Sequence, residues 1–319
     1  MQKISRFLGS PAGLVLRFAV SLALIATLAL RVDTSQLAAV SDRMAVLPAI
    51  AGLALALVAY PLCAWRWYLL LKGTGVPLPF GHAHTVTWIG QFYNAFLPGG
   101  IGGDATRLWY AFHDHPQQKA AATTATLLDR AIGFAVLVVL AALALLLAGR
   151  TAPEGQSGKL AWLLGTIAAG LALTAWIAAA VVLPRLPRAW SDATARLRAA
   201  PGALVGATLL SALVWLLDFA SGWCLALSLG LDLNPIALSA ALGLAYLSTL
   251  LPISLGGHGL REGALVLALH WLGQADAHGT DGLAAFALLF LTVSLATSLV
   301  GGLFLLMVRR RDPSTPPRA

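Results

Sequence analysis

The chain has 319 residues, of which 59% are hydrophobic and 11% charged, and its mean hydropathy is +0.81. A soluble domain carries about 25% charged residues, so this composition argues against a soluble enzyme and indicates an all-α polytopic membrane protein. The net charge of +8 sits at the ends of apolar segments and not in a basic run on a soluble face, so nucleic acid is not an expected partner.

Long apolar stretches predict the membrane spans, because a helix of about 20 residues crosses the ~30 Å hydrocarbon core. Six full transmembrane helices are expected, at about Leu14–Leu30, Met44–Leu71, Ala120–Gly149, Leu160–Leu183, Ala203–Leu229 and Gly282–Val308. The first is expected to be retained, because no convincing small-residue cleavage site follows it. The Pro-rich end, residues 312–319, is expected to be a disordered tail.

Basic residues set the expected orientation. Lys3 and Arg6 precede the first span, and the loop 184–200 contains four arginines and one aspartate. Both belong on the cytoplasmic side of a bacterial inner membrane, which places both termini there. This topology holds only if the segments Phe80–His115 and Pro235–Trp271 each enter and leave on one side. We therefore predict two re-entrant helical hairpins, the first opening to the cytoplasm and the second to the outside.

An eleven-residue pattern occurs in both segments, as Leu97–Arg107 and as Leu251–Arg261. The two copies share Leu-Pro-x-x-[Ile/Leu]-Gly-Gly-x-x-x-Arg, and the sequence before each copy is also similar. Two similar units inserted from opposite faces form an inverted repeat, which is common among transporters. We predict one transmembrane domain, 1–311, in which repeat one spans about 44–149 and repeat two about 201–308.

The repeated pattern combines a helix breaker with a cation. The proline ends a first half-helix, and a second half-helix is expected to begin near Gly103 or Gly257. The first amides of that half-helix have no helical partner and favour an anion such as phosphate, and an arginine one turn later reaches the same anion. Candidate substrate-binding residues are therefore Gly102, Gly103, Arg107, Gly256, Gly257 and Arg261. The alternative is that the glycines serve tight helix packing.

Further charges lie within apolar sequence, where they are rare and costly. Asp129 and Arg130 are adjacent in a predicted span. Adjacent residues on a helix do not face each other, so each should have a different partner, with Arg107, Arg261 and Glu262 as the candidates. Both are expected to line the binding cavity, with a structural ion pair as the alternative. Asp104, in the first copy of the pattern, is expected to balance the arginines there.

Three other charged positions have weaker interpretations. Asp218 lies mid-span, where it is either protonated or paired with a motif arginine, and it is a candidate for proton coupling. Glu262 is a candidate binding residue, although a glutamate in a first helical turn also complements the helix dipole. Arg17 and Arg66 are most simply residues whose side chains extend to the membrane surface.

No metal site, cofactor or catalytic motif is expected. His82, His84 and the run His113–His115 fall in segments at the mouth of the first hairpin, where solvated side chains are the simpler interpretation. Cys63 and Cys224 lie within predicted spans and lack metal-ligand spacing. The tryptophans near span ends fit an aromatic belt; they are Trp65, Trp67, Trp109, Trp190 and Trp271.

The segments Gln91–Asp104 and Leu251–Glu262, together with Asp129-Arg130, resemble the lysylphosphatidylglycerol synthase transmembrane-region family. These are flippase-like domains that also occur at the N-terminus of the multiple peptide resistance factor. The resemblance covers essentially the whole chain. It implies movement of lipids with charged or sugar-bearing head groups between leaflets. Because this sequence lacks the soluble aminoacyl-transferase domain, we expect a stand-alone transport domain and not a synthase.

The leading hypothesis is a lipid flippase whose two hairpins meet near the bilayer centre, where Arg107 and Arg261 hold an anionic lipid head group. The alternative is an integral-membrane enzyme that modifies lipid head groups or lipid-linked sugars through the acid–histidine cluster around His113. A third is a non-catalytic scaffold. Beyond the lipid, the candidate partners are a second copy of the chain and a lipid-synthesis enzyme.

Overall fold

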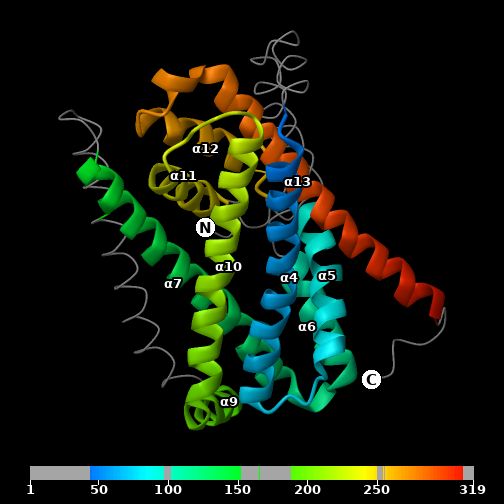
Figure 1. Cartoon of the computed structure of the whole chain (residues 1–319). Helices are drawn as coiled ribbons and strands as arrows, with labels where there is room; N and C mark the ends of the chain where they lie inside the picture. The colour runs from blue at the N-terminus through cyan, green and yellow to red at the C-terminus, as the bar shows by residue number, and fades with distance from the viewer. Residues whose placement is uncertain are drawn as a thin grey trace, which may run out of the picture.

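The structure, a computed structural model, describes residues 44–96, 102–151, 188–249 and 256–311, together with Gly165 and Ser254 (Figure 1). All regular secondary structure in these ranges is helical, as the sequence predicts. The helices in chain order are α4 (Val46–Thr74), α5 (Phe80–Phe96), α6 (Gly102–Asp114), the short 3-10 helix η1 (Pro116–Gln118), α7 (Lys119–Thr151), α9 (Arg188–Ala199), α10 (Pro201–Ser228), α11 (Pro235–Ser248), α12 (Leu260–Trp271) and α13 (Ala275–Arg311).

Four helical stretches are long and apolar enough to cross a membrane. They are Val46–Thr74, Pro116–Gly149, Pro201–Ser228 and Gly279–Val308, and they coincide with four of the six predicted spans. The multi-pass prediction is therefore confirmed. The other two predicted spans lie outside the described residues, apart from Gly165, as does the predicted tail at 312–319.

Glycine and proline set the helix boundaries next to each predicted hairpin. Gly75 (φ +89°) caps the end of α4, and Gly230 (φ +72°) follows the end of α10. Residues with a Cβ rarely adopt these dihedrals, so glycine stops each helix cleanly. α11 then begins with Pro235 at its first position, where the fixed φ of proline suits a helix start. The side chain of Asn234 accepts hydrogen bonds from two amides of that first turn.

α4 and α10 form a closely packed antiparallel pair at the centre of the molecule (Figure 1). At one end, the Ala45 amide donates to the Ser228 carbonyl at 2.9 Å, and the Ser221 hydroxyl donates to the Gly52 carbonyl at 2.7 Å. At the other end, Gly206 of α10 lies against the side chain of Leu69. The small residues allow the two backbones to approach closely, as is common between membrane helices.

α5 and α6 fold back on each other as a helical hairpin, called hairpin one below. At its open end, His82 Nε2 lies 3.1 Å from Asp114 Oδ2. Towards its tip, a side-chain carbon on Gly90 would lie 3.0 Å from the Gly103 carbonyl oxygen, so glycine is needed for this approach. The turn between the two helices, residues 97–101, contains the proline of the first motif and lies outside the described residues.

α11 and α12 form hairpin two. At its open end, the Asn234 amide donates a hydrogen bond to Gln274 Oε1 at 3.0 Å, which joins the two ends of the hairpin. Hairpin one follows the end of α4 and hairpin two follows the end of the antiparallel α10, so the hairpins open at opposite ends of the molecule. Their tips meet, because a Cβ on Gly256 would lie 2.9 Å and 3.1 Å from the carbonyl oxygens of Asn94 and Ala95. Figure 1 shows α11 and α12 near the upper end of α10, and α5 and α6 beside the lower part of α4.

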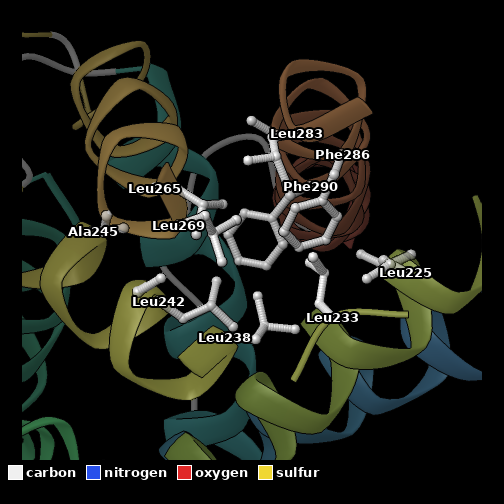
Figure 2. Close-up of a cluster of buried hydrophobic side chains, with 14 of the residues drawn as sticks. Leu225, Leu233, Leu238, Leu242, Ala245, Leu265, Leu269, Leu283, Phe286 and Phe290 are labelled. Atoms are coloured by element: carbon white, nitrogen blue, oxygen red, sulfur yellow. The ribbon is translucent and has the colours of Figure 1, made fainter. Parts of the chain in front are cut away.

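The apolar core has two main clusters, one for each hairpin. In the first, Leu238 and Leu242 of α11 and Leu265 and Leu269 of α12 pack against Phe286 of α13 (Figure 2). In the second, side chains of α4 to α7 pack together with residues of α9 and α10; its members include Trp67, Leu70, Leu71, Ile89 and Tyr110. Apolar burial therefore fixes each hairpin against its neighbouring long helices.

The start of α12 differs from the prediction. A helix was expected from near Gly257, but α12 begins at Leu260. Gly256, Gly257 and Gly259 all have positive φ, at +56°, +81° and +82°, and a right-handed helix cannot contain them. In hairpin one the helix begins at Gly102, within the motif itself, as expected. Arg107 is therefore one turn into α6, whereas Arg261 is the second residue of α12 and not one turn in.

The loop predicted at 184–200 contains a helix, α9. Its Ala193, Thr194 and Leu197 side chains are buried, whereas Arg196 and Arg198 are exposed in its last turn. This amphipathic pattern allows a short polar helix to pack across the ends of α4 and α7. The prediction of a loop was wrong because it rested on the four arginines and did not consider the apolar residues spaced along one face of a helix.

Candidate functional site

A cavity of about 590 Å³ lies where α4, α10 and both hairpins approach one another. Eight of the sequence-predicted site residues line it: Gly103, Asp104, Arg107, Asp129, Arg130, Asp218, Gly256 and Arg261. Gly102, Gly257 and Glu262 are not among the described residues that line it. Residues of the two motifs, which are far apart in the sequence, therefore line the same cavity.

One group of charged side chains lies where α6 and α7 face α4, and we call it the first charge cluster: Arg66, Asp104, Arg107, Asp129 and Arg130. Arg66 holds the Asp129 carboxylate with two hydrogen bonds, Nε to Oδ1 at 2.6 Å and Nη2 to Oδ2 at 2.9 Å. Arg107 Nη1 donates to Asp129 Oδ2 at 3.1 Å and lies 4.0 Å from Asp104 Oδ1. Arg130 Nε donates to the Asp104 carboxylate. Asp129 and Arg130 therefore have different partners, as predicted.

Arg66 corrects the sequence interpretation. Its side chain does not extend to the membrane surface, because the residue is 9% exposed and its guanidinium also donates to Ser211 Oγ at 3.1 Å. The bidentate contact with Asp129 satisfies both charges in the interior. No local signal identifies this role, because the partner lies 63 residues later in the chain.

Trp67 is a second correction. It was predicted to belong to an aromatic belt, but it is fully buried and its indole nitrogen donates to Thr126 Oγ1 at 3.1 Å. The Arg107 guanidinium carbon lies 5.3 Å from the centre of its ring, within range of a cation–π contact. Trp65 and Trp109, in contrast, have exposed side chains that suit a membrane surface.

The second charge cluster lies at hairpin two and consists of Arg261, Glu262, Asp218 and Tyr246. Arg261 Nη2 lies 2.6 Å from Glu262 Oε1, and the guanidinium packs over the rings of Tyr246 and Phe290. The other carboxylate oxygen of Glu262 accepts the Gly259 amide at 2.7 Å. Glu262 is fully buried and joins the start of α12 to Arg261, which is the helix-dipole role that the sequence analysis allowed.

Asp218 of α10 faces the cavity from the other side of this cluster. It forms a hydrogen bond with the hydroxyl of Tyr246 and also interacts electrostatically with Arg261. Among the described residues, no ion pair joins the first charge cluster to the second. Arg107 and Arg261 were expected to act on one anion together, and in this structure each has its own carboxylate.

Two backbone amides at the starts of α6 and α12 already have side-chain partners within the chain. The Gly103 amide donates to Asn94 Oδ1 at 2.7 Å, and the Gly259 amide donates to Glu262. The arginine side chains, and not these two amides, are therefore the cavity's main groups for an anion. Asn94 also lines the cavity and was not predicted as a site residue, although it belongs to the segment that carries the family resemblance.

Neutral polar side chains complete the wall between the clusters. Gln91 Nε2 donates to the Tyr60 hydroxyl at 2.9 Å and lies 3.3 Å from Ser298 Oγ, and the Tyr60 hydroxyl lies 3.4 Å from Thr297 Oγ1. These contacts join α4, α5 and α13. A polar wall of this kind can form hydrogen bonds with a polar group inside an otherwise apolar protein.

The histidines at the open end of hairpin one lie apart from the cavity lining. His113 stacks on Trp109, with ring centres 5.7 Å apart, and His84 Nε2 accepts a hydrogen bond from Trp88. Burial lowers the pKa of His82, and the nearby Asp114 carboxylate partly offsets this shift. Within the described residues, no group of three or more His, Cys, Asp and Glu side chains has metal-binding geometry.

Comparison with known proteins agrees with these features. Residues 14–302 match the lysylphosphatidylglycerol synthase TM region, a match that includes both hairpins and both charge clusters. No curated protein sequence matches the chain. Since the match covers well over half of the sequence, the chain belongs to the lysylphosphatidylglycerol synthase TM region family.

Proposed function

We propose that this protein is a flippase that moves an anionic, phosphate-bearing lipid between the leaflets of the bacterial inner membrane. The observation that carries this proposal is the cavity itself, into which Arg107 and Arg261 project from two hairpins that open at opposite ends of the molecule. Charged side chains inside a membrane protein mark substrate pathways. A path that can be reached from either hairpin allows a head group to pass from one leaflet to the other.

In this proposal the hairpins are re-entrant and the chain is an inverted repeat. α4 to α7 and α10 to α13 follow the same order of long helix, hairpin and long helix, and α4 and α10 run antiparallel. Inverted halves with a binding site at their interface are typical of transporters. Hairpin one opens to the cytoplasm, because α9 with its arginines packs at the same end of α4. Both chain termini are then cytoplasmic.

Blocking the cavity is the direct test. Cys63 lines the cavity and Cys224 does not, so a Cys224→Ser variant carries one cysteine, facing the proposed path. In liposomes, this variant is expected to move a fluorescent phospholipid between leaflets until a bulky maleimide is attached to Cys63. A Cys63→Ser/Cys224→Ser variant serves as the control and should be insensitive to the reagent. Absence of lipid movement before labelling, or an unchanged rate after it, would contradict the proposal.

We further propose that Asp218 carries a coupling proton. Tyr246 from α11 and Arg261 from α12 act on its carboxylate, and Asp218 in turn acts electrostatically on Tyr60 and Cys63 of α4. A carboxylate among such groups can change its charge as the cavity fills and empties.

The proton proposal predicts that a pH difference across the liposome membrane changes the rate for the wild-type protein. Asp218→Asn should keep a measurable rate but lose this response. Asp232→Asn, a change at an exposed position beyond the end of the same helix, is the control and should respond like the wild type. An Asp218→Asn variant with an unchanged response would exclude Asp218 as the proton carrier.

A further inference from the structure

The two charge clusters differ in their balance of charge. The first contains three arginines and two aspartates, so with all five ionised it has one surplus positive charge. In the second, the charge of Arg261 is matched by Glu262, which is fully buried 2.6 Å away, and Asp218 adds a further acidic group, so this cluster has no surplus positive charge. Among the described residues that line the cavity, the surplus positive charge therefore lies at the first charge cluster.

A buried cluster with one surplus positive charge favours a ligand with one negative charge, because any charge left uncompensated is costly where water is scarce. A phosphodiester carries one negative charge. A phosphomonoester carries nearly two above neutral pH, since its second pKa is about 6. A dianion at the first charge cluster would bring one extra negative charge next to two aspartates.

We propose that the first charge cluster selects lipids by head-group charge, accepting singly charged phosphodiesters over phosphomonoesters and diphosphates, and that Asp104 is the residue that sets this selectivity. This inference rests on the proposed function and adds the charge class of the lipid. Removing the negative charge of Asp104 raises the surplus of the cluster to two, which matches a dianion.

Asp104 fits this role better than Asp129. The Asp129 side chain is 2% exposed and its carboxylate is locked by the two hydrogen bonds from Arg66. The side chains of Asp104 and its partner Arg130 are 18% and 35% exposed and both line the cavity. Asp104 also lies in the first turn of α6, next to the tip of hairpin one. A head group that enters the cavity thus meets the Asp104–Arg130 pair at its accessible side.

The test uses two short-chain lipids with the same acyl chains, phosphatidylmethanol as the phosphodiester and phosphatidic acid as the phosphomonoester. Their head groups differ by one methyl group. Each competes at pH 8 with a fluorescent short-chain phosphatidylmethanol for the purified full-length protein. The wild type is expected to prefer phosphatidylmethanol, and Asp104→Asn is expected to shift the preference towards phosphatidic acid by at least about tenfold.

Two further variants separate selectivity from damage to the fold. Asp104→Asn/Arg130→Gln removes one charge of each sign and should restore the preference of the wild type. Asp192→Asn, at an exposed position on α9, makes the same chemical change outside the cavity and should leave the preference unchanged. Equal preferences in the wild type and Asp104→Asn, or a double variant that still prefers phosphatidic acid, would overturn the inference. A wild-type protein that binds neither lipid would overturn the proposed function and the inference together.

Discussion

Asp129→Ala is expected to be the most damaging single substitution in the protein, lowering the free energy of unfolding by about 3–5 kcal/mol and abolishing lipid transport. The residue is 1% exposed, and its carboxylate is shared by Arg66 of α4 and Arg107 of α6. Its removal leaves the buried guanidinium of Arg66 and the partly buried guanidinium of Arg107 without this anion. Thermal or chemical unfolding in detergent measures the loss, with Asp192→Ala on the exposed side of α9 as the control.

A double substitution separates stability from transport in this cluster. Replacing a buried ion pair by apolar side chains of similar size is often neutral for stability, because neither partner is left as an uncompensated charge. Arg107 loses Asp129 but still lies 4.0 Å from Asp104. Arg66→Met/Asp129→Leu should therefore recover much of the stability lost in Asp129→Ala. It should not recover transport, because the arrangement that holds Arg107 is gone. An Asp129→Ala protein as stable as the wild type would show that the cluster contributes little to the fold.

Arg107→Gln is expected to slow lipid transport by about tenfold or more while leaving the protein folded. Arg107 forms one hydrogen bond with Asp129, whereas Arg66 forms two, so Asp129 keeps its principal partner when Arg107 is neutralised. A hydrogen bond to a charged group contributes about 1.5–3 kcal/mol, which corresponds to a ten- to hundredfold effect on a bound phosphate. The rate of fluorescent-lipid movement in liposomes measures the effect.

Two further variants test whether the effect of Arg107→Gln comes from the guanidinium group at this position. Arg107→Lys keeps the charge but loses the planar fork, so its rate should fall between those of the wild type and Arg107→Gln. Arg198→Gln removes an exposed arginine of α9 and should transport at the wild-type rate. If a double Arg107→Gln/Arg261→Gln variant leaves the cellular phenotype intact although its lipid transport is lost, the protein acts as a scaffold and not as a flippase.

Local signals in the sequence were sufficient to find the hairpins. Pro79 precedes α5, and Asn234-Pro235 begins α11, so the observed starts of both helices agree with the predicted segments. α5 and α11 end at Phe96 and Ser248, just before the breaker motifs, as the helix-ending role of proline predicts. The sequence likewise identified most of the charged residues that line the cavity, since charges in apolar sequence are conspicuous.

Long-range pairing was beyond the reach of the sequence. Arg66 and Asp129 are in contact only because α4 packs on α7. The sequence around each residue carries no signal that identifies the other as its partner. The same holds for Trp67, whose burial depends on where α6 and α7 lie. The late start of α12 was missed because glycine permits both helical and left-handed dihedrals, and the sequence alone does not say which is used.

The unequal starts of α6 and α12 have an energetic consequence. Arg107 is the sixth residue of its helix and Arg261 the second, so the two arginines differ in depth by about 6 Å along their helix axes, at 1.5 Å per residue. Halves that differ in this way cannot exchange conformations as equivalent partners. In the proposed flippase, the inward-facing and outward-facing states would therefore differ in free energy, which would give the empty protein a preferred resting side before any lipid or proton gradient acts on it.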